Sequence, residues 1–330
     1  MKAVRTIYSS IMASCALALT GALCTHAALA QSGNYPNHTI TLVLPFAAGS
    51  GTDTTTRLIS KELGAALNTP MVIDNKAGAN GSIAASYVAR SAPDGYTLFV
   101  TTNTSHSANP YLLKNMTYDP VKDFTPIART GDLPFMLVIN PQIPANSVAD
   151  LIALAKKEPG KYSYASGSSS AIVSGATFAR LAGIDLLHVP YKSSPPALTD
   201  VIAGRVSMMF VDVPTALPHV NAKALKALAV TTKYRSALLP DLPTMDEAGV
   251  KGFDVTSWQG YFGPANMPKE IVAKLNTEIR KVVERPDIKK ELASRGMEAF
   301  SGTPEEFDAF VKDQLVVWKR LITDAGIEPQ

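Results

Sequence analysis

The sequence has 330 residues, of which 46% are hydrophobic and 18% charged, and its 31 basic and 28 acidic residues leave a formal net charge of +3. This near-neutral balance argues against nucleic-acid binding and against a polybasic membrane anchor. The length is sufficient for one large domain or two medium-sized domains.

Residues 1–30 have the pattern of a secretory signal peptide. Two basic residues precede the apolar stretch Ile11–Cys24, and Ala28-Leu29-Ala30 matches a small-residue cleavage site. We therefore predict export, with cleavage near Ala30. Both cysteines lie before that site, so the mature chain can form no disulfide and must rely on a hydrophobic core.

The mature chain begins with a predicted strand, a turn of small residues and a helix. Thr39–Leu44 is rich in aliphatic and β-branched residues, as a buried strand is, and Pro45 ends it. Residues 47–51 have very small side chains, and apolar residues at helical spacing follow over 53–67. The first N–H groups of a helix have no partner within it and lie at the positive end of its dipole. The stretch therefore predicts an anion site at this helix start.

Strands and helices then alternate along the chain. Further strands are predicted at residues 71–74, 96–101, 135–139, 162–165, 187–189, 206–210, 225–231 and 258–262. Further helices are predicted at residues 82–90, 147–157, 171–182, 196–203, 268–283, 286–295 and 304–322. This alternation indicates an α/β fold, with parallel sheet covered by helices on both faces. Trp318 lies on the apolar face of the last helix, and we expect it in the core.

The turn at residues 49–54 resembles a dinucleotide-binding fingerprint, and Asp74 ends the second strand as a ribose-binding acid would. Two residues argue against this function. Thr54 stands where close packing needs Gly or Ala, and Asp53 would place a carboxylate where the pyrophosphate has to bind. No nucleotide or other cofactor is expected.

Hydrolase and metal sites are also poorly supported. Gly167–Ala171 approaches the G-x-S-x-G pattern but lacks the last glycine, and nothing in the sequence brings His188 or His219 to Ser169. His188 lies within a predicted strand, which favours a structural role. The histidines are widely spaced and have no i,i+4 or cysteine partner, so no metal site and no enzymatic activity are expected.

The serine-rich segment 166–170 repeats the organisation of the first loop. It follows the strand at 162–165 and precedes the helix at 171–182, about 120 residues after the first helix start. If two halves of the molecule face each other, both helix starts point into one cleft and can clamp a carboxylate. The alternative is that these serines only cap their own helix.

Pro45–Asp53 resembles the P-F-x-x-G-G-x-x-D signature of the Bug family, the extracytoplasmic solute receptors of tripartite tricarboxylate transporters. Ser50 stands where the signature has its second glycine. Further segments similar to the family are Ala92–Thr97, Tyr118–Phe124, His188–Lys192, Pro196–Asp200, Ala216–His219, Leu225–Thr231, Leu242–Thr244 and Glu247–Gly249. The resemblance extends over nearly the whole chain after Ala30.

The resemblance implies a two-lobed periplasmic-binding-protein fold of type II, a Venus flytrap that closes on its solute. Lobe 1 would combine residues 32–133 with 254–330, and lobe 2 would be 134–253. The implied protein is a periplasmic monomer that captures a small carboxylate, either a mono- or dicarboxylate, an amino acid or an aromatic acid. It would deliver the solute to membrane permease subunits. The alternative is a receptor of the same fold that presents its closed form to a signalling sensor.

The resemblance also implies a set of ligand-binding residues. The first clamp would be Phe46, Ala48, Gly49, Ser50 and Thr52, with Asp53 organising the loop by accepting backbone N–H groups. The other proposed contacts are Thr102, Asn103, His106, Ser166, Gly167, Ser168, Ser169, Ser170 and Asp212. Asp212 is expected either to line the cleft or to cap the next segment. If ionised in the cleft, it would repel a second carboxylate or attract an amino group.

Overall fold

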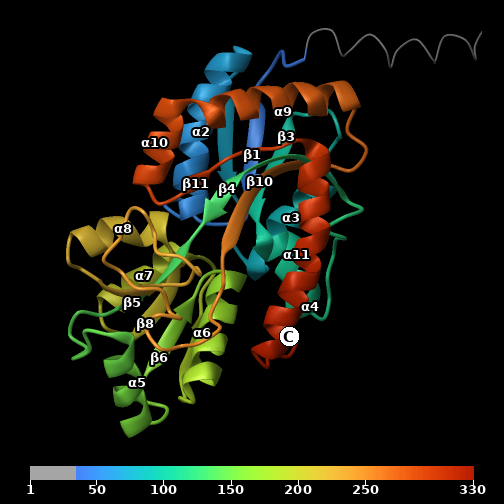
Figure 1. Cartoon of the computed structure of the whole chain (residues 1–330). Helices are drawn as coiled ribbons and strands as arrows, with labels where there is room; N and C mark the ends of the chain where they lie inside the picture. The colour runs from blue at the N-terminus through green and yellow to red at the C-terminus, as the bar shows by residue number, and fades with distance from the viewer. Residues whose placement is uncertain (1–34) are drawn as a thin grey trace, which may run out of the picture. The chain divides into compact units, whose positions relative to one another are not determined.

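Two mixed β-sheets organise the chain from His38 to Gln330, which forms one unit of the computed structural model. The structure describes residues 35–330, and the signal peptide predicted for residues 1–30 lies outside them. Figure 1 shows each sheet with its own helices, which gives the two lobes of the predicted fold class. Within residues 35–330, no helix combines the length and hydrophobicity needed to cross a membrane.

The first lobe is built on a six-stranded sheet with the order β11-β4-β10-β3-β1-β2. Its strands are β1 (Ile40–Leu44), β2 (Met71–Asn75), β3 (Thr97–Thr102), β4 (Phe124–Leu133), β10 (Ser257–Pro264) and β11 (Glu298–Ala299). Strands β1, β2 and β3 are parallel, and β10 runs antiparallel to both β3 and β4. The carboxyl ends of β1, β3 and β4 therefore lie at the same edge of the sheet.

The second lobe is built on a five-stranded sheet with the order β7-β6-β8-β5-β9. Its strands are β5 (Phe135–Ile139), β6 (Ser163–Ser166), β7 (Leu187–Pro190), β8 (Met208–Asp212) and β9 (Lys226–Val230). Strand β5 runs antiparallel to β8 and β9, whereas β6 is parallel to β7 and β8. The carboxyl ends of β6 and β8 therefore lie at the edge of the sheet where β5 begins.

The prediction of parallel strands is wrong for β5 and β10, which lie where the chain crosses between the lobes. Only one residue separates β4 from β5, so the chain enters the second sheet from the edge that faces the first. A strand that enters there must run opposite to β6 and β8, which approach that edge with their carboxyl ends. The return of the chain through β10 reverses direction in the first sheet for the same reason.

Helices cover both sheets. In the first lobe they are α2 (Gly51–Leu67), α3 (Ser82–Ala89), α4 (Asn109–Leu112), α9 (Lys269–Glu284), α10 (Pro286–Ser294) and α11 (Pro304–Asp324), with the short turns η2 (Ala79–Gly81) and η3 (Thr104–Ala108). In the second lobe they are α5 (Val148–Lys157), α6 (Ser169–Ala182), α7 (Ser194–Ile202) and α8 (Val213–Asn221). The elements β4, β11, η2, η3, α4 and α8 were not predicted from the sequence.

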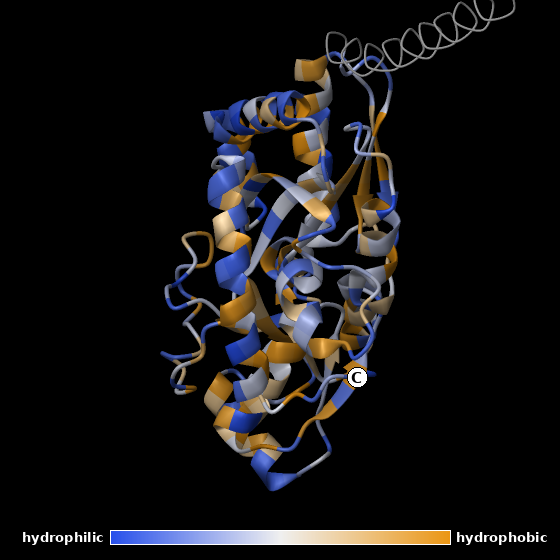
Figure 2. Ribbon diagram, turned by 90° about the vertical axis from the view of Figure 1, so that its right-hand side faces the viewer, coloured by the Kyte–Doolittle hydropathy of each residue, from blue (hydrophilic) through white to orange (hydrophobic). Residues whose placement is uncertain are grey.

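Apolar residues lie mainly on the strands and on the inward faces of the helices, as the orange and blue bands of Figure 2 show. In the second lobe, a buried cluster includes Leu137, Phe178 and Phe210. Trp318 of α11 is 1% exposed and belongs to the same cluster, so its predicted place in the core is confirmed. Helix α11 starts in the first lobe and its second half packs on α6, which gives the two lobes a shared apolar contact.

Candidate functional site

Strand ends from both sheets meet at one cavity between the lobes. Its lining residues within the described chain are Phe46, Ser50, Thr52, Thr102, Leu133, Phe135, Ser168, Ser194, Asp212 and Ser257. Hydroxyl and aromatic groups dominate this lining, and Asp212 is the one charged side chain among the ten. The cavity has a volume of ≈ 20 Å³, enough for about one water molecule.

The turn after β1 is held in place by Asp53. Gly49 adopts a left-handed backbone with φ of +82°, and its N–H donates to Asp53 Oδ2 at 2.9 Å. This is the backbone contact predicted for Asp53. Ser50 has an ordinary φ of −68° and caps α2, because its Oγ accepts the N–H of Asp53 at 3.2 Å. The turn therefore needs no glycine at position 50.

Asp53 is 2% exposed, yet it keeps its charge readily. Burial alone would raise the pKa of this carboxyl group, but Arg57, the amide of Gly49 and Asn75 donate to it and hold its pKa below the usual range. Arg57 contacts both carboxylate oxygens at 2.9 Å from the same helix face. The hydrogen-bond partners of the Asp53 carboxylate within the described chain all belong to the first lobe, as expected for a residue that organises the loop.

Four helices begin at the cavity. Their N-cap residues are Ser50 for α2, Ser168 for α6, Ser193 for α7 and Asp212 for α8. Each helix has at least nine residues and points the positive end of its dipole to this region. Fewer N–H groups are unpaired at α7 and α8, because Pro195, Pro196 and Pro214 have none and the N–H groups of Val213 and Thr215 donate to Pro134 and Asp212. The sequence placed two of these helix starts, those of α2 and α6, at a ligand site, and the fold adds those of α7 and α8.

Hydrogen bonds within three residue pairs of the described chain join the lobes around the cavity. The N–H of Ala47 donates to Ser193 Oγ at 3.0 Å, and the N–H of Gly51 donates to Thr215 Oγ1 at 2.7 Å. Asn103 Nδ2 donates to Ser170 Oγ at 3.1 Å. In each pair the first residue belongs to the first lobe and the second to the second lobe, so the lobes are closed on each other.

Asp212 both caps α8 and lines the cavity, so the two alternatives expected for it occur together. Its Oδ1 accepts the N–H of Thr215 at 2.9 Å and the hydroxyl of Thr215 at 2.5 Å. Burial raises the pKa of this carboxyl group, and the hydrogen bonds from the N–H and hydroxyl of Thr215 oppose that rise only in part.

Some residues predicted to bind ligand lie beside the cavity without lining it. Ala48 and Gly49 are exposed on the outer side of the first turn. Asn103 and Ser170 are buried, and they form a hydrogen bond with each other between the lobes. A Cβ at Gly167 would lie 2.2 Å from the backbone of Ser193, so this glycine allows the loops before α6 and α7 to pack together.

His106 lies in the core and not in the cleft, so its predicted ligand contact is not supported. Its ring is fully buried in η3, stacks on Phe262 at 3.9 Å and packs near Phe99 and Phe124. Nδ1 lies 2.9 Å from Ser105 Oγ. Burial lowers the pKa of His106 to about 3 and keeps it neutral. A π-helical turn directs the side chain inward, which the sequence did not indicate.

His188 contacts Ser166 and not Ser169. Ser166 Oγ lies 2.7 Å from His188 Nε2, a contact between the neighbouring strands β6 and β7. The ring of His188 also stacks on Tyr164 at 4.8 Å. Ser169 is buried at the start of α6, and its Oγ has no hydrogen-bond partner among the described residues. The pair is part of the sheet, as the structural interpretation of His188 expected.

The sequence analysis missed Leu133, Phe135, Ser194 and Ser257 as lining residues. For Ser194 a signal was present, because Ser193 is followed by Pro195 in the first turn, a pattern typical of a helix start. The other three lie where the chain crosses between the lobes. Nothing local distinguishes such residues from ordinary strand ends.

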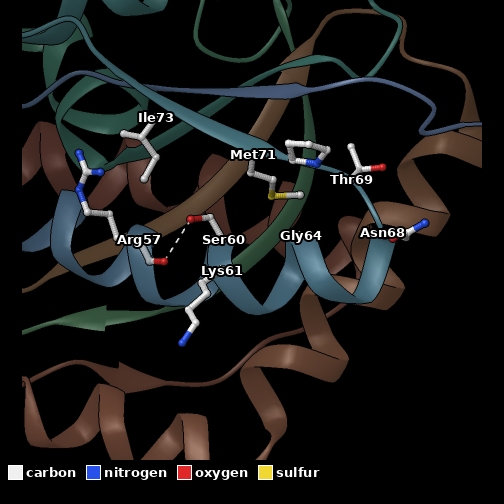
Figure 3. Close-up of a pocket in the computed structure, with 9 residues that line it drawn as sticks. Arg57, Ser60, Lys61, Gly64, Asn68, Thr69, Met71 and Ile73 are labelled. Atoms are coloured by element: carbon white, nitrogen blue, oxygen red, sulfur yellow. Dashed lines mark hydrogen bonds between the residues drawn. The ribbon is translucent and has the colours of Figure 1, made fainter.

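A larger groove of ≈ 580 Å³ lies outside the cleft, between α2 and the edge strand β2 (Figure 3). It is lined by Arg57, Ser60, Lys61, Gly64, Asn68, Thr69, Pro70, Met71 and Ile73. Ser60 Oγ donates to the carbonyl of Arg57, as the dashed line in Figure 3 shows, and Arg57 itself is paired with Asp53. Within residues 35–330, none of the residues that line this groove begins a helix, so its larger volume does not make it the better anion site.

Comparisons with known proteins agree with this geometry. The sequence model of a family described as "Tripartite tricarboxylate transporter family receptor" matches residues 55–327. A protein of Pseudomonas sp. strain P51, called UPF0065 protein in the tcbD-tcbE intergenic region, is 34% identical over 318 residues, which are 95% of this chain and 93% of the relative. Protein BugT of Bordetella pertussis is 30% identical over 303 residues, 91% of this chain and 93% of BugT.

Several solved structures share the two-lobed fold. Rpa4515 of R. palustris with adipate is 36% identical, with a TM-score of 0.88 over 90% of this chain and 100% of Rpa4515. The periplasmic binding protein BugD is 34% identical, with a TM-score of 0.85 over 90% of this chain and 100% of BugD. MatC of Rhodopseudomonas palustris with bound malate is 32% identical, with a TM-score of 0.82 over 87% of this chain and 100% of MatC.

Proposed function

This chain belongs to the family of tripartite tricarboxylate transporter receptors, and from that premise we propose that it captures a small carboxylate in the periplasm and delivers it, as a monomer, to membrane permease subunits. The predicted resemblance to the Bug proteins is confirmed by BugT and BugD. The proposed lobes keep the predicted boundaries, 32–133 with 254–330 and 134–253. The strands of each sheet fall within these ranges, which supports them.

The observation that carries the proposal is the convergence of helix starts on a cavity without cations. Of the described lining residues, none is Lys, Arg or His, whereas hydroxyl groups come from both lobes. Backbone N–H groups at helix starts and neutral hydroxyl donors can hold a carboxylate without a fixed counter-charge. The proposed ligand contacts are Phe46, Ser50, Thr52, Thr102, Leu133, Phe135, Ser168, Ser194, Asp212 and Ser257.

The size of the cavity indicates how the protein works. Small-molecule sites usually have volumes of roughly 300–1,000 Å³, whereas this one has ≈ 20 Å³ with the lobes in contact. We therefore propose that the lobes separate to admit a solute and then close around it. The bonds from Ala47 and Gly51 to the opposite lobe would break in that opening.

Isothermal titration calorimetry tests the proposal. The exported protein is purified from the periplasm, freed of ligand by unfolding and refolding, and titrated with adipate, malate, aspartate, hexanoate and benzoate. We expect saturable 1:1 binding of at least one acid. Folded, ligand-free protein that binds none of them would contradict the proposal.

Two serine variants provide a matched control. Ser168 and Ser147 are both N-caps whose Oγ accepts the amide three residues on, but only Ser168 lines the cavity. Loss of either cap costs about 1 kcal/mol of stability. Ser168→Ala should also weaken carboxylate binding at least about threefold, the effect of losing one hydrogen bond, whereas Ser147→Ala should leave it unchanged. Equal affinities in the two variants would argue against a ligand site at α6.

A further inference from the structure

The interlobe cavity contains an acidic side chain where a carboxylate-binding site would be expected to have neutral or basic ones. Of the described residues that line it, Asp212 is the one with a charged side chain. Asp53, the nearest acid along α2, is neutralised by Arg57 and faces the first turn. The carboxyl group of Asp212 has no cationic partner of this kind, because its hydrogen bonds come from the backbone and hydroxyl of Thr215.

Asp212 lies at the start of two helices from different lobes. It is the N-cap of α8, and a Cβ placed on Gly51, the first residue of α2, would lie 2.0 Å from Asp212 Oδ1. The hydroxyl of Thr215 connects the two helices, since it donates to Asp212 Oδ1 and accepts the N–H of Gly51. Asp212 therefore takes the position that an anionic ligand would take at the start of α2.

The starts of α6 and α7 supply a second position for an anion in the lining. Ser168 is the N-cap of α6 and Ser194 the first residue of α7, both line the cavity, and Asp212 is the one acid among its described lining residues. Ser169 adds a buried hydroxyl without a partner within the described chain at the same helix start. The aromatic rings of Phe46 and Phe135 and the side chain of Leu133 lie in the same lining and suit an apolar body.

We propose that Asp212 acts as a built-in carboxylate that makes this receptor selective for monocarboxylates whose far end is uncharged or carries a hydroxyl or amino donor. The solute carboxylate binds at the starts of α6 and α7, its apolar body lies along the aromatic lining, and its far end faces Asp212. A second carboxylate there would meet a like charge at short range, which disfavours binding. This inference rests on the proposed function and specifies the solute class for it.

The test compares three acids with the same six-carbon backbone: hexanoate, 6-hydroxyhexanoate and adipate. Calorimetry at pH 7.5 gives their dissociation constants for the wild type and for Asp212→Asn, in which the amide oxygen can still accept from Thr215. We expect the wild type to bind 6-hydroxyhexanoate more tightly than adipate. Asp212→Asn should shift the ratio of the two constants toward adipate about tenfold, a change of about 1.4 kcal/mol.

The controls separate local charge from other effects. Asp200→Asn removes an acid from the same lobe, at a half-buried position of α7 outside the cavity where it is paired with Arg205, and it should leave the ratio unchanged. Asp212→Ser, which keeps an N-cap residue, should reproduce the shift if the asparagine variant does not fold. A ratio that neither Asp212 variant changes, in protein that binds the acids, overturns this inference alone. No binding of any acid by any folded variant overturns the proposed function and the inference with it.

Discussion

His106 shows how a single buried residue can make stability depend on pH. Burial in the aromatic cluster keeps its ring neutral, with a pKa of about 3, whereas an unfolded chain protonates histidine at about pH 6.5. Below pH 6.5 the unfolded state therefore binds a proton that the native state does not, so stability falls as pH falls. The effect ends near pH 3, where the native state also becomes protonated.

We predict that the free energy of unfolding falls by about 2 kcal/mol when the pH is lowered from 7 to 5, because of His106. In His106→Phe this contribution disappears, because phenylalanine keeps the aromatic packing but does not titrate. Urea unfolding of both proteins at pH 5, 6 and 7 gives the two slopes. The comparison of slopes is independent of any constant cost of fitting the larger ring. Equal slopes would contradict the prediction, because they would show that His106 has the same pKa in the native and unfolded states.

At the scale of the element, the turn between β1 and α2 shows which of its residues must be glycine. Its left-handed residue is Gly49, whereas Ser50 has a φ of −68° and serves as the N-cap. The serine at position 50 therefore costs the turn nothing and gives the amide of Asp53 a hydrogen-bond acceptor.

We predict that Ser50→Ala lowers the free energy of unfolding by about 1 kcal/mol and Ser50→Gly by only a few tenths of that value, since glycine is an acceptable N-cap and alanine is not. Urea unfolding curves of both variants give these differences. A larger loss for glycine than for alanine would show that the serine side chain is not acting as the cap.

At the scale of the whole molecule, closure depends on a few bonds between lobes. The hydroxyl of Thr215 accepts the N–H of Gly51 across the interface, whereas the similar hydroxyl of Thr199 donates to the carbonyl of Pro195 within α7. Replacing either threonine by valine preserves shape but removes the hydroxyl. Only the first substitution removes a contact between lobes.

We predict that Thr215→Val shifts the ligand-free protein toward an open arrangement and weakens solute binding by roughly threefold to tenfold, the equivalent of one hydrogen bond. Small-angle X-ray scattering should show a larger radius of gyration for this variant than for wild type, with the difference removed by saturating solute. Thr199→Val should match wild type in both measurements. An unchanged radius together with an unchanged affinity would show that this bond does not contribute to closure.

The sequence determined the local structure of this protein. Most strands and helices occur within a few residues of their predicted positions, because apolar periodicity and turn residues act over short distances. The capping box of α11, formed by Thr303 and Glu306, and the N-cap Ser147 of α5 are local features of the same kind. The contact from Gly49 to Asp53 spans four residues, which is why the signature motif was sufficient to predict it.

Strand β4 was missed because its sequence contradicts local rules. It contains Pro126 and Gly131, and it carries the ion pair of Arg129 with Asp132. The strand exists because β10 and β11 pair with it from positions far along the chain. Arg129 also packs on Phe310 of α11, 3.6 Å from the ring centre, so its charge is accommodated by tertiary contacts. No window of sequence contains these partners.

The composition of the cleft was decided by the tertiary structure alone. Gly51 meets Thr215 across 164 residues, and Asn103 meets Ser170 across 67. The crossing of the chain at β4 and β5 reverses a strand and brings the starts of α7 and α8 to the same place as those of α2 and α6. Sequence patterns specify where a helix begins, because its capping residues are neighbours. They do not specify which helix starts share a cleft, since that depends on pairing between distant strands.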